Sequence, residues 1–218
     1  MRTTFLAFIS MTLAGNIWAP SPAAAHPHVF VDGGIDLQFD GEGRLAALEV
    51  TWLYDEFETL YMLSSYALDL NDAGELDEAD RLALVRELSI WPDDFDGSAH
   101  LTVDGEAVPL DWPEGVDATL EDGRLQKTFT RQLTEPLDLQ GGLAEVAFYE
   151  STYFFAFSIT MPPRMLGNAP DCRAEVAAFD PDAHSDLQDT LSTLGREETP
   201  TIPNVGKLFA DRVLLTCG

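Results

Sequence analysis

Hydrophobic and polar residues alternate along most of the chain, and this alternation predicts a protein built mainly from short β-strands. The first two predicted strands, residues 28–39 and 45–53, flank the turn sequence Asp40-Gly41-Glu42-Gly43 and so form an opening β-hairpin. Regularly spaced short strands are typical of a β-sandwich. The other elements that the pattern predicts are strands at 101–103, 107–110, 116–120, 125–133, 143–149, 153–160, 174–179 and 212–217, a partly helical segment at 182–195 and a short helix at 204–211.

The period of the pattern changes between residues 56 and 90, where it fits helices instead of strands. A second amphipathic helix around residues 82–88 follows the first and ends near Pro92. We therefore expect one domain, residues 26–218, that is mainly β and sandwich-like, with an inserted helical hairpin and an α+β fold overall. The apolar stripe that predicts the first helix consists of Phe57, Leu60, Tyr61, Leu63 and Leu68.

Residues 1–25 have the form of a secretory signal peptide. Arg2 is followed by an apolar stretch from Phe5 to Ala14, and the segment ends in Ala23-Ala24-Ala25, a small-residue sequence that signal peptidase reads. The apolar stretch is too short for a helix that spans a bilayer of ~30 Å, although an uncleaved anchor is the alternative. We expect cleavage just before His26, a periplasmic location, and a mature protein that is not integral to the membrane.

The charge balance excludes some classes of partner. The chain has 12 basic and 38 acidic residues, a formal net charge of −26. Such a charge repels phosphate backbones and anionic lipids, so we expect no nucleic-acid partner. The sequence contains no P-loop, nucleophile-elbow, zinc-protease or dinucleotide-binding motif, which favours a protein that is not an enzyme.

Two cysteines, Cys172 and Cys217, lie in the mature chain. In an oxidising compartment an even pair of this kind usually forms a disulfide, and we predict the bridge Cys172–Cys217. A metal site with two thiolates is the alternative, but the Cys-x-x-Cys spacing of zinc sites is absent.

The predicted cleavage would leave the sequence His26-Pro27-His28 at the new N-terminus. A free amine and two imidazoles are nitrogen donors suited to nickel, zinc, cobalt or copper, although two solvated histidines at a chain end are the plainer alternative. In an extended segment His26, His28 and Asp32 point to one face. Pro27 has no amide hydrogen, so the backbone-amide type of copper site is excluded. We predict a metal site formed by His26, His28, Asp32 and Glu150, the last from a turn between two apolar strands.

Residues 69–80 have the register of an EF-hand calcium loop between two helices. Ala73 replaces an oxygen ligand, and an Asp stands in the last position where a longer Glu normally binds through both oxygens. Because each lost ligand oxygen weakens calcium binding, we expect millimolar affinity or none, with a turn that keeps only the loop geometry as the alternative. The candidate ligands are Asp69, Asn71, Glu75, Asp77 and Asp80.

Taken together, these motifs resemble a bacterial family of unknown function that is described as the periplasmic component of an uncharacterised ABC-type transport system. Members are often associated with nickel/cobalt-type membrane permeases, which implies a partner of this kind and a role in metal handling. The family more often has Tyr-Asp-Pro-x-Tyr where this chain has Tyr149-Glu150-Ser151-Thr152-Tyr153, so the carboxylate is kept. The segments that carry the resemblance are His26 to Asp32, Val50-Thr51-Trp52 with Asp55-Glu56-Phe57, the loop at 69–80, Leu120 to Leu125, Tyr149 to Tyr153 and Phe209 to Cys217.

The sequence therefore predicts a non-enzymatic periplasmic accessory protein that binds a divalent transition metal and serves a metal transporter. An interaction module that docks on a membrane permease without binding metal is the main alternative. An enzyme with copper held by the terminal amine and the imidazoles is a third hypothesis, based on analogy alone.

Overall fold

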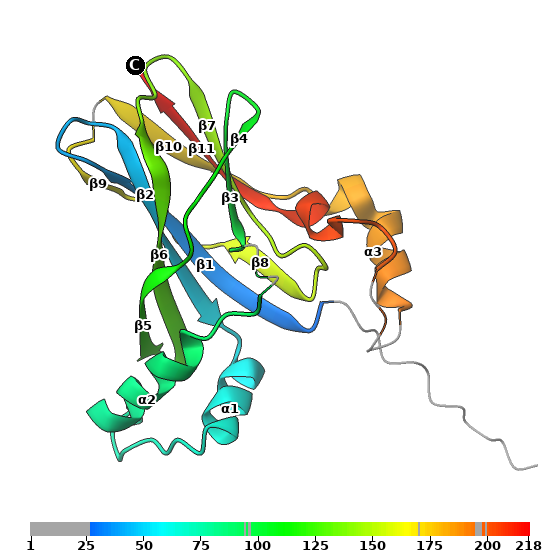
Figure 1. Cartoon of the computed structure of the whole chain (residues 1–218). Coiled ribbons are helices and arrows are strands. Elements are labelled where there is room, and N and C mark those ends of the chain that lie inside the picture. Colours follow the sequence, from blue (N-terminus) through cyan, green and yellow to red (C-terminus); the bar gives the residue numbers. More distant parts are fainter. Residues whose placement is uncertain (1–26, 94, 96, 170, 195–197, 199) are drawn as a thin grey trace, which may run out of the picture.

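The computed structural model describes residues 27–218 except 94, 96, 170, 195–197 and 199, and in it the predicted strands form two β-sheets (Figure 1). The first sheet has the order β5-β6-β2-β1-β8, and β9 pairs with the far part of β1. Its strands are β1 (Val29–Phe39), β2 (Leu45–Tyr54), β5 (Glu114–Glu121), β6 (Arg124–Leu137), β8 (Phe155–Ile159) and β9 (Met165–Gly167).

The second sheet has the order β10-β11-β7-β3-β4, and all of its pairings are antiparallel. Together the two sheets confirm the expectation of a mainly β, sandwich-like protein with an α+β fold overall. The strands of this sheet are β3 (Ala99–Val103), β4 (Glu106–Val108), β7 (Leu143–Phe148), β10 (Cys172–Ala177) and β11 (Asp211–Cys217).

One hydrophobic core joins the two sheets. Gly33 of β1 allows a close approach of the two sheets, because a Cβ there would lie 2.6 Å from a ring carbon of Phe148 on β7. The buried carboxylate of Asp211, at the start of β11, accepts a 2.7 Å hydrogen bond from the backbone N–H of Ile159 on β8. Its other oxygen accepts from the backbone N–H of Phe179 at 2.7 Å. A satisfied buried carboxylate thus links strands of both sheets.

The helical insertion consists of α1 (Glu56–Ser65) and α2 (Glu78–Leu88), which lie beyond one end of the first sheet (Figure 1). Each helix begins at an aspartate whose side chain accepts from a backbone N–H in the first turn, Asp55 for α1 and Asp77 for α2. Thr59 of α1 is buried and accepts a 2.9 Å hydrogen bond from the backbone N–H of Leu125, so α1 is fixed to β6.

The apolar stripe of α1 is the main departure from the expected packing. Of its five residues Leu63 is buried and Leu68 is partly buried, whereas Phe57, Leu60 and Tyr61 are 86%, 64% and 67% exposed. Three of the five stripe residues therefore face away from the core and form an exposed apolar surface.

The C-terminal part contains three short helical elements beside β11, namely the 3₁₀ helices at Pro181–His184 and Val205–Phe209 and the α-helix α3 (Ser185–Ser192). A small separate cluster of Leu191, Val205 and Phe209 packs α3 against the 3₁₀ helix at Val205–Phe209. The predicted disulfide is confirmed, since Cys172 on β10 is bonded to its register partner Cys217 on β11. Within the described residues, no helix is long and apolar enough to cross a membrane.

Candidate functional site

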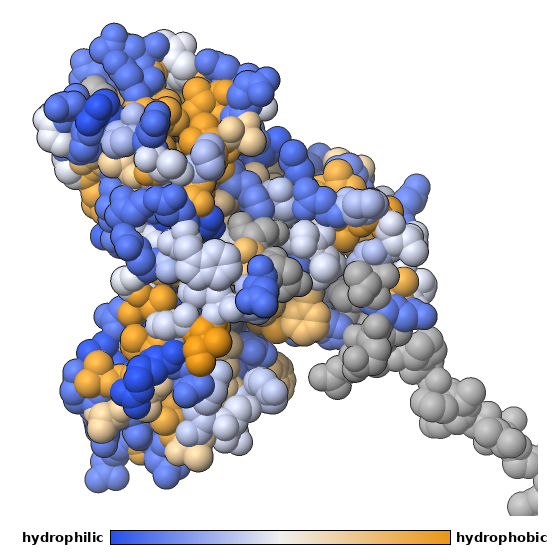
Figure 2. All heavy atoms as spheres, viewed as in Figure 1, coloured by the Kyte–Doolittle hydropathy of each residue, from blue (hydrophilic) through white to orange (hydrophobic). Residues whose placement is uncertain are grey.

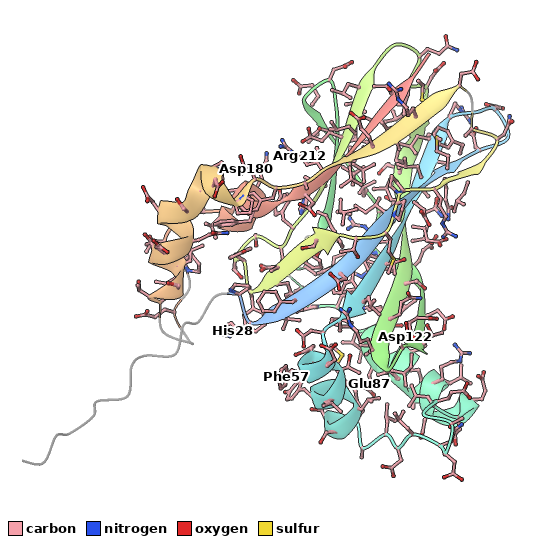
Figure 3. All side chains as sticks on the ribbon, turned by 180° about the vertical axis from the view of Figure 1, so that it is seen from behind. His28, Phe57, Glu87, Asp122, Asp180 and Arg212 are labelled. Carbon is pink, nitrogen blue, oxygen red and sulfur yellow. A yellow bond between two sulfur atoms is a disulfide. The ribbon has the colours of Figure 1, made fainter. Side chains whose placement is uncertain are left out.

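His28 lies immediately before β1, where the chain runs alongside the start of β8. Its backbone N–H donates to the carbonyl of Phe154 at 2.9 Å, and its ring centroid lies 4.7 Å from that of the Phe154 ring. Figure 3 labels His28 at the end of the molecule that also carries Phe57 of α1. His26, the other predicted imidazole ligand, lies outside the described residues.

Glu150 lies in the connection between β7 and β8, and it contacts Phe154, the residue that His28 also contacts. Its Oε2 accepts from the backbone N–H of Phe154 at 2.9 Å and from the hydroxyl of Thr152 at 2.9 Å. Its Oε1 accepts from the backbone N–H of Thr152 at 2.7 Å and from the hydroxyl of Ser151 at 3.2 Å. Both His28 and Glu150 thus contact Phe154, while all four hydrogen bonds of this carboxylate shape its own loop.

Asp32 has a different partner. Its Oδ2 accepts a 2.8 Å charge-assisted hydrogen bond from Arg124 on β6, and the same guanidinium donates to the carbonyls of Leu53 and Tyr54 on β2. Asp32 is therefore engaged on the surface of the first sheet. Among the residues that the structure describes, no three His, Cys, Asp or Glu side chains form a group that could hold a metal ion.

The loop at 69–80 uses its polar residues mainly to hold its own backbone. Asn71 Oδ1 accepts from the backbone N–H groups of Ala73 and Glu75 at 2.8 and 3.0 Å, and Gly74 adopts a φ of +78°. Asp77 Oδ1 accepts from the N–H of Asp80 at 2.8 Å as the cap of α2. Helix α1 ends at Ser65, before Asp69, so the candidate first ligand does not continue from a helix as it does in an EF-hand.

The sequence interpretation missed an aromatic cavity of about 390 Å³ beside the helical insertion, between β2, β6, α2 and the segment that contains Glu150. A cavity of this size is within the range of small-molecule sites in proteins. Fifteen described residues line it, and most are apolar or aromatic: Trp52, Tyr66, Glu87, Leu88, Ile90, Trp91, Pro92, Phe95, Ser98, Lys127, Glu150, Ser151, Thr152, Phe154 and Phe155.

Lys127 on β6 is the unusual residue of this cavity, because it is only 3% exposed. Its Nζ lies 3.3 Å from the ring centroid of Trp91 and 5.2 Å from that of Trp52, and it makes no hydrogen bond or ion pair within the described part of the chain. Burial disfavours the charged ammonium and lowers the pKa of Lys127 to about 7. A large fraction of this lysine is therefore neutral near physiological pH.

Arg131 on the same strand provides a contrast. It is also buried, but its Nε donates to the carbonyl of Asp111 at 2.6 Å and its Nη2 to that of Leu110 at 3.3 Å. A buried cation with such acceptors is an ordinary structural feature. Lys127 has aromatic faces in place of acceptors, which distinguishes it as a candidate functional group.

Trp52 is the centre of the aromatic wall, and its ring contacts seven other side chains. Its indole N–H is buried and has no acceptor among the described residues. Two groups contact the ring of Trp91, since Phe95 stacks on it with ring centroids 4.3 Å apart and the Nζ of Lys127 lies 3.3 Å from its centroid. The contacts of the Trp52 ring are Tyr54, Trp91, Phe95, Phe129, Phe155, Phe157 and Lys127.

A signal for this cavity was present in the sequence. Along β6 the buried positions are Leu125, Lys127, Phe129, Arg131 and Leu133, so the lysine falls in register with the apolar residues of an alternating strand. A lysine at an inward position of a strand is unusual enough to mark a site.

Replacement of the buried lysine tests this description. K127M removes the desolvated ammonium and should raise the free energy of unfolding at pH 7 by about 1–4 kcal/mol. Between pH 7 and 10.5 the unfolded wild-type chain binds more protons than the folded one. The unfolding free energy of the wild type therefore rises relative to that of K127M as pH increases through this window. Denaturant unfolding at pH 7 and pH 10 measures both quantities. K207M, a change at an exposed lysine, is the matched control. A difference in unfolding free energy between wild type and K127M that is the same at pH 7 and pH 10 would show that Lys127 is not desolvated in the folded protein.

Comparison with known proteins identifies a family for the whole chain but no described relative. No curated protein matches. A family model described as a protein of unknown function, DUF1007, matches residues 11–217, which include the hairpin, the helical insertion and both sheets. The chain therefore belongs to the DUF1007 family.

Proposed function

We propose that this chain is a non-enzymatic accessory protein of the periplasm that binds a divalent transition metal and serves a metal transporter. The observation that supports it best is that His28 and Glu150, two residues proposed as ligands from the sequence alone, contact the same residue, Phe154. Glu150 and Phe154 also line the aromatic cavity, so the proposed metal site lies at its rim.

The proposal depends mainly on the nitrogen donors. An amine and two imidazoles, from His26 and His28, suit nickel, zinc, cobalt or copper better than calcium or magnesium. Glu150 would join them only by exchanging hydrogen bonds within its own loop, so its contribution is the smaller one. Asp32 is excluded from the proposed ligand set, because Arg124 already neutralises it.

The location and the partner rest on different arguments. The Cys172–Cys217 disulfide is consistent with an oxidising, extracytoplasmic compartment. The transporter is inferred from the resemblance to a family associated with nickel/cobalt-type permeases. The net charge of −26 would raise the local concentration of cations around the protein.

Metal titration of the processed chain tests the proposal. We expect binding of nickel, zinc, cobalt or copper with a dissociation constant below ~10 µM by calorimetry. H26A and H28A should each weaken it at least tenfold because each removes a nitrogen donor, and E150Q should weaken it less. D32N is expected to have no effect on affinity.

H184A is the matched control for the histidine changes, since His184 is the last residue of the 3₁₀ helix at Pro181–His184, far along the chain from the proposed ligands. The absence of binding tighter than ~10 µM, or affinity unchanged in H26A and H28A, would contradict the metal proposal.

A second candidate function, docking on a membrane permease without metal, is favoured by the exposed stripe of α1. Phe30 of β1 adds to this surface, because its backbone N–H donates to the α1 cap Asp55 at 2.9 Å and its ring is exposed. Apolar side chains also stand among polar ones over the helical end of the molecule in Figure 2. Exposed aromatic residues grouped in this way are typical of protein interfaces.

This candidate predicts that F57S combined with Y61S lowers capture of a nickel/cobalt-type membrane permease at least fivefold, whether or not a chelator is present. The reason is that interface energy concentrates in exposed aromatic residues of this kind. I202S, which removes an exposed apolar residue elsewhere, is the control and should leave capture unchanged. Equal capture of the double variant and the control in a pull-down would exclude this surface as the contact.

A further inference from the structure

Two side chains of the aromatic cavity, the nearly buried Lys127 and the buried indole of Trp52, have a donor without an acceptor among the described residues. The ammonium of Lys127 contacts only the rings of Trp52, Trp91 and Phe129 within the described part of the chain. The indole N–H of Trp52, on the neighbouring strand and directly opposite Lys127 in the register, is likewise buried without an acceptor among those residues. Buried donors of this kind are rare in native proteins because they lose their hydrogen bonds to water. An acceptor on a bound molecule would satisfy them.

The carboxylates of the cavity wall do not supply this acceptor. Glu150 already accepts four hydrogen bonds within its own loop. Glu87 is on the exposed side of α2, and neither acid forms an ion pair with Lys127. Apart from these two acids and Lys127, the only titratable side chain among the described lining residues is the phenol of Tyr66. Among the described residues that line the cavity, the positive charge therefore has no counter-ion.

The shape and charge of the cavity restrict what could enter. Its walls include the flat rings of Trp91, Phe95 and Phe155, which favour a planar apolar molecule. A volume of about 390 Å³ admits a small organic molecule but not a folded partner. Two acids in the lining and a net charge of −26 would repel a molecule with several negative charges.

We propose that this cavity binds a small organic monocarboxylate with a flat apolar body. Its carboxylate accepts a hydrogen bond from the ammonium of Lys127, and its body packs against the aromatic walls. The anion stabilises the protonated lysine, so binding takes up a proton wherever the free protein holds Lys127 neutral. Affinity therefore falls as pH rises above the pKa of about 7 that burial gives to Lys127 in the free protein.

Calorimetry with indole-3-acetate as the probe and neutral indole-3-acetamide as its matched analogue tests this proposal. The processed chain is used in EDTA, so that the outcome is independent of metal binding. We expect a dissociation constant on the order of 10–100 µM for the acid at pH 6, and binding of the amide at least tenfold weaker. K127M should weaken binding of the acid at least tenfold, whereas K207M leaves it unchanged. A change from pH 6 to pH 9 should also weaken wild-type binding at least tenfold.

Near-ultraviolet circular dichroism of K127M establishes that its aromatic core is intact before the comparison is made. W91A, which keeps the lysine and removes one wall, is a second variant and should weaken the acid and the amide alike. Equal affinity of acid and amide, full binding by folded K127M, or no binding of the acid at millimolar concentration would each overturn the proposal. Tighter binding of the cation tryptamine than of the acid would overturn it as well.

Discussion

The packing of aromatic rings around Trp52 is the interaction on which the helical end of this protein depends. Trp52 is on the central strand β2, and its ring contacts side chains from β6, from β8 and from the segment that follows α2. Aromatic clusters bury large areas and prefer edge-to-face or offset geometry, so they fix the position of the segments that carry them. Trp91 and Phe95 are held against the first sheet in this way, and a cavity remains where their rings meet β6 and the Glu150 segment.

The same packing explains why Lys127 is unusual. Its register partner across the sheet is Trp52, so the lysine must point into the aromatic wall and not into water. A long aliphatic stem suits such a wall, but the ammonium loses its hydration there, and the cation–π contact with Trp91 compensates only in part. Structural stability alone does not require a lysine at this position. Its presence fits a site in which a bound molecule supplies the missing negative charge.

Local patterns in the sequence predicted most of the elements but not how they meet. Alternation identified β1, β2 and β6, and the cysteine count predicted the disulfide, because these features depend on neighbouring residues and on chemistry. The parallel pairing of β1 with β8 and the short strand β9 were not predicted, since a pairing partner more than a hundred residues away leaves no local signal. The exposure of Phe57 was missed for a similar reason: periodicity defines a stripe on a helix but not what that stripe faces.

In the candidate site, too, local sequence patterns indicated some residues, whereas others depend on contacts between distant parts of the chain. His28 and Glu150 were proposed from the sequence, and both contact Phe154, whereas Asp32 is engaged by Arg124 from a strand that the local pattern could not place beside it. The inward position of Lys127 was a local signal for the cavity, but its lining comes from five separate segments that only the three-dimensional structure brings together.

The most direct test of the claim that Lys127 is a desolvated cation in a ligand cavity is a pH titration by lysine-selective ¹³C NMR. The chain has two lysines, Lys127 and Lys207, so the spectrum contains two assignable signals. Burial of the ammonium predicts that the Lys127 signal titrates with a pKa of about 7 in the free protein and moves to higher pH when indole-3-acetate is added. A Lys127 signal that titrates at the ordinary lysine value of 10.5, with or without the probe, would contradict it.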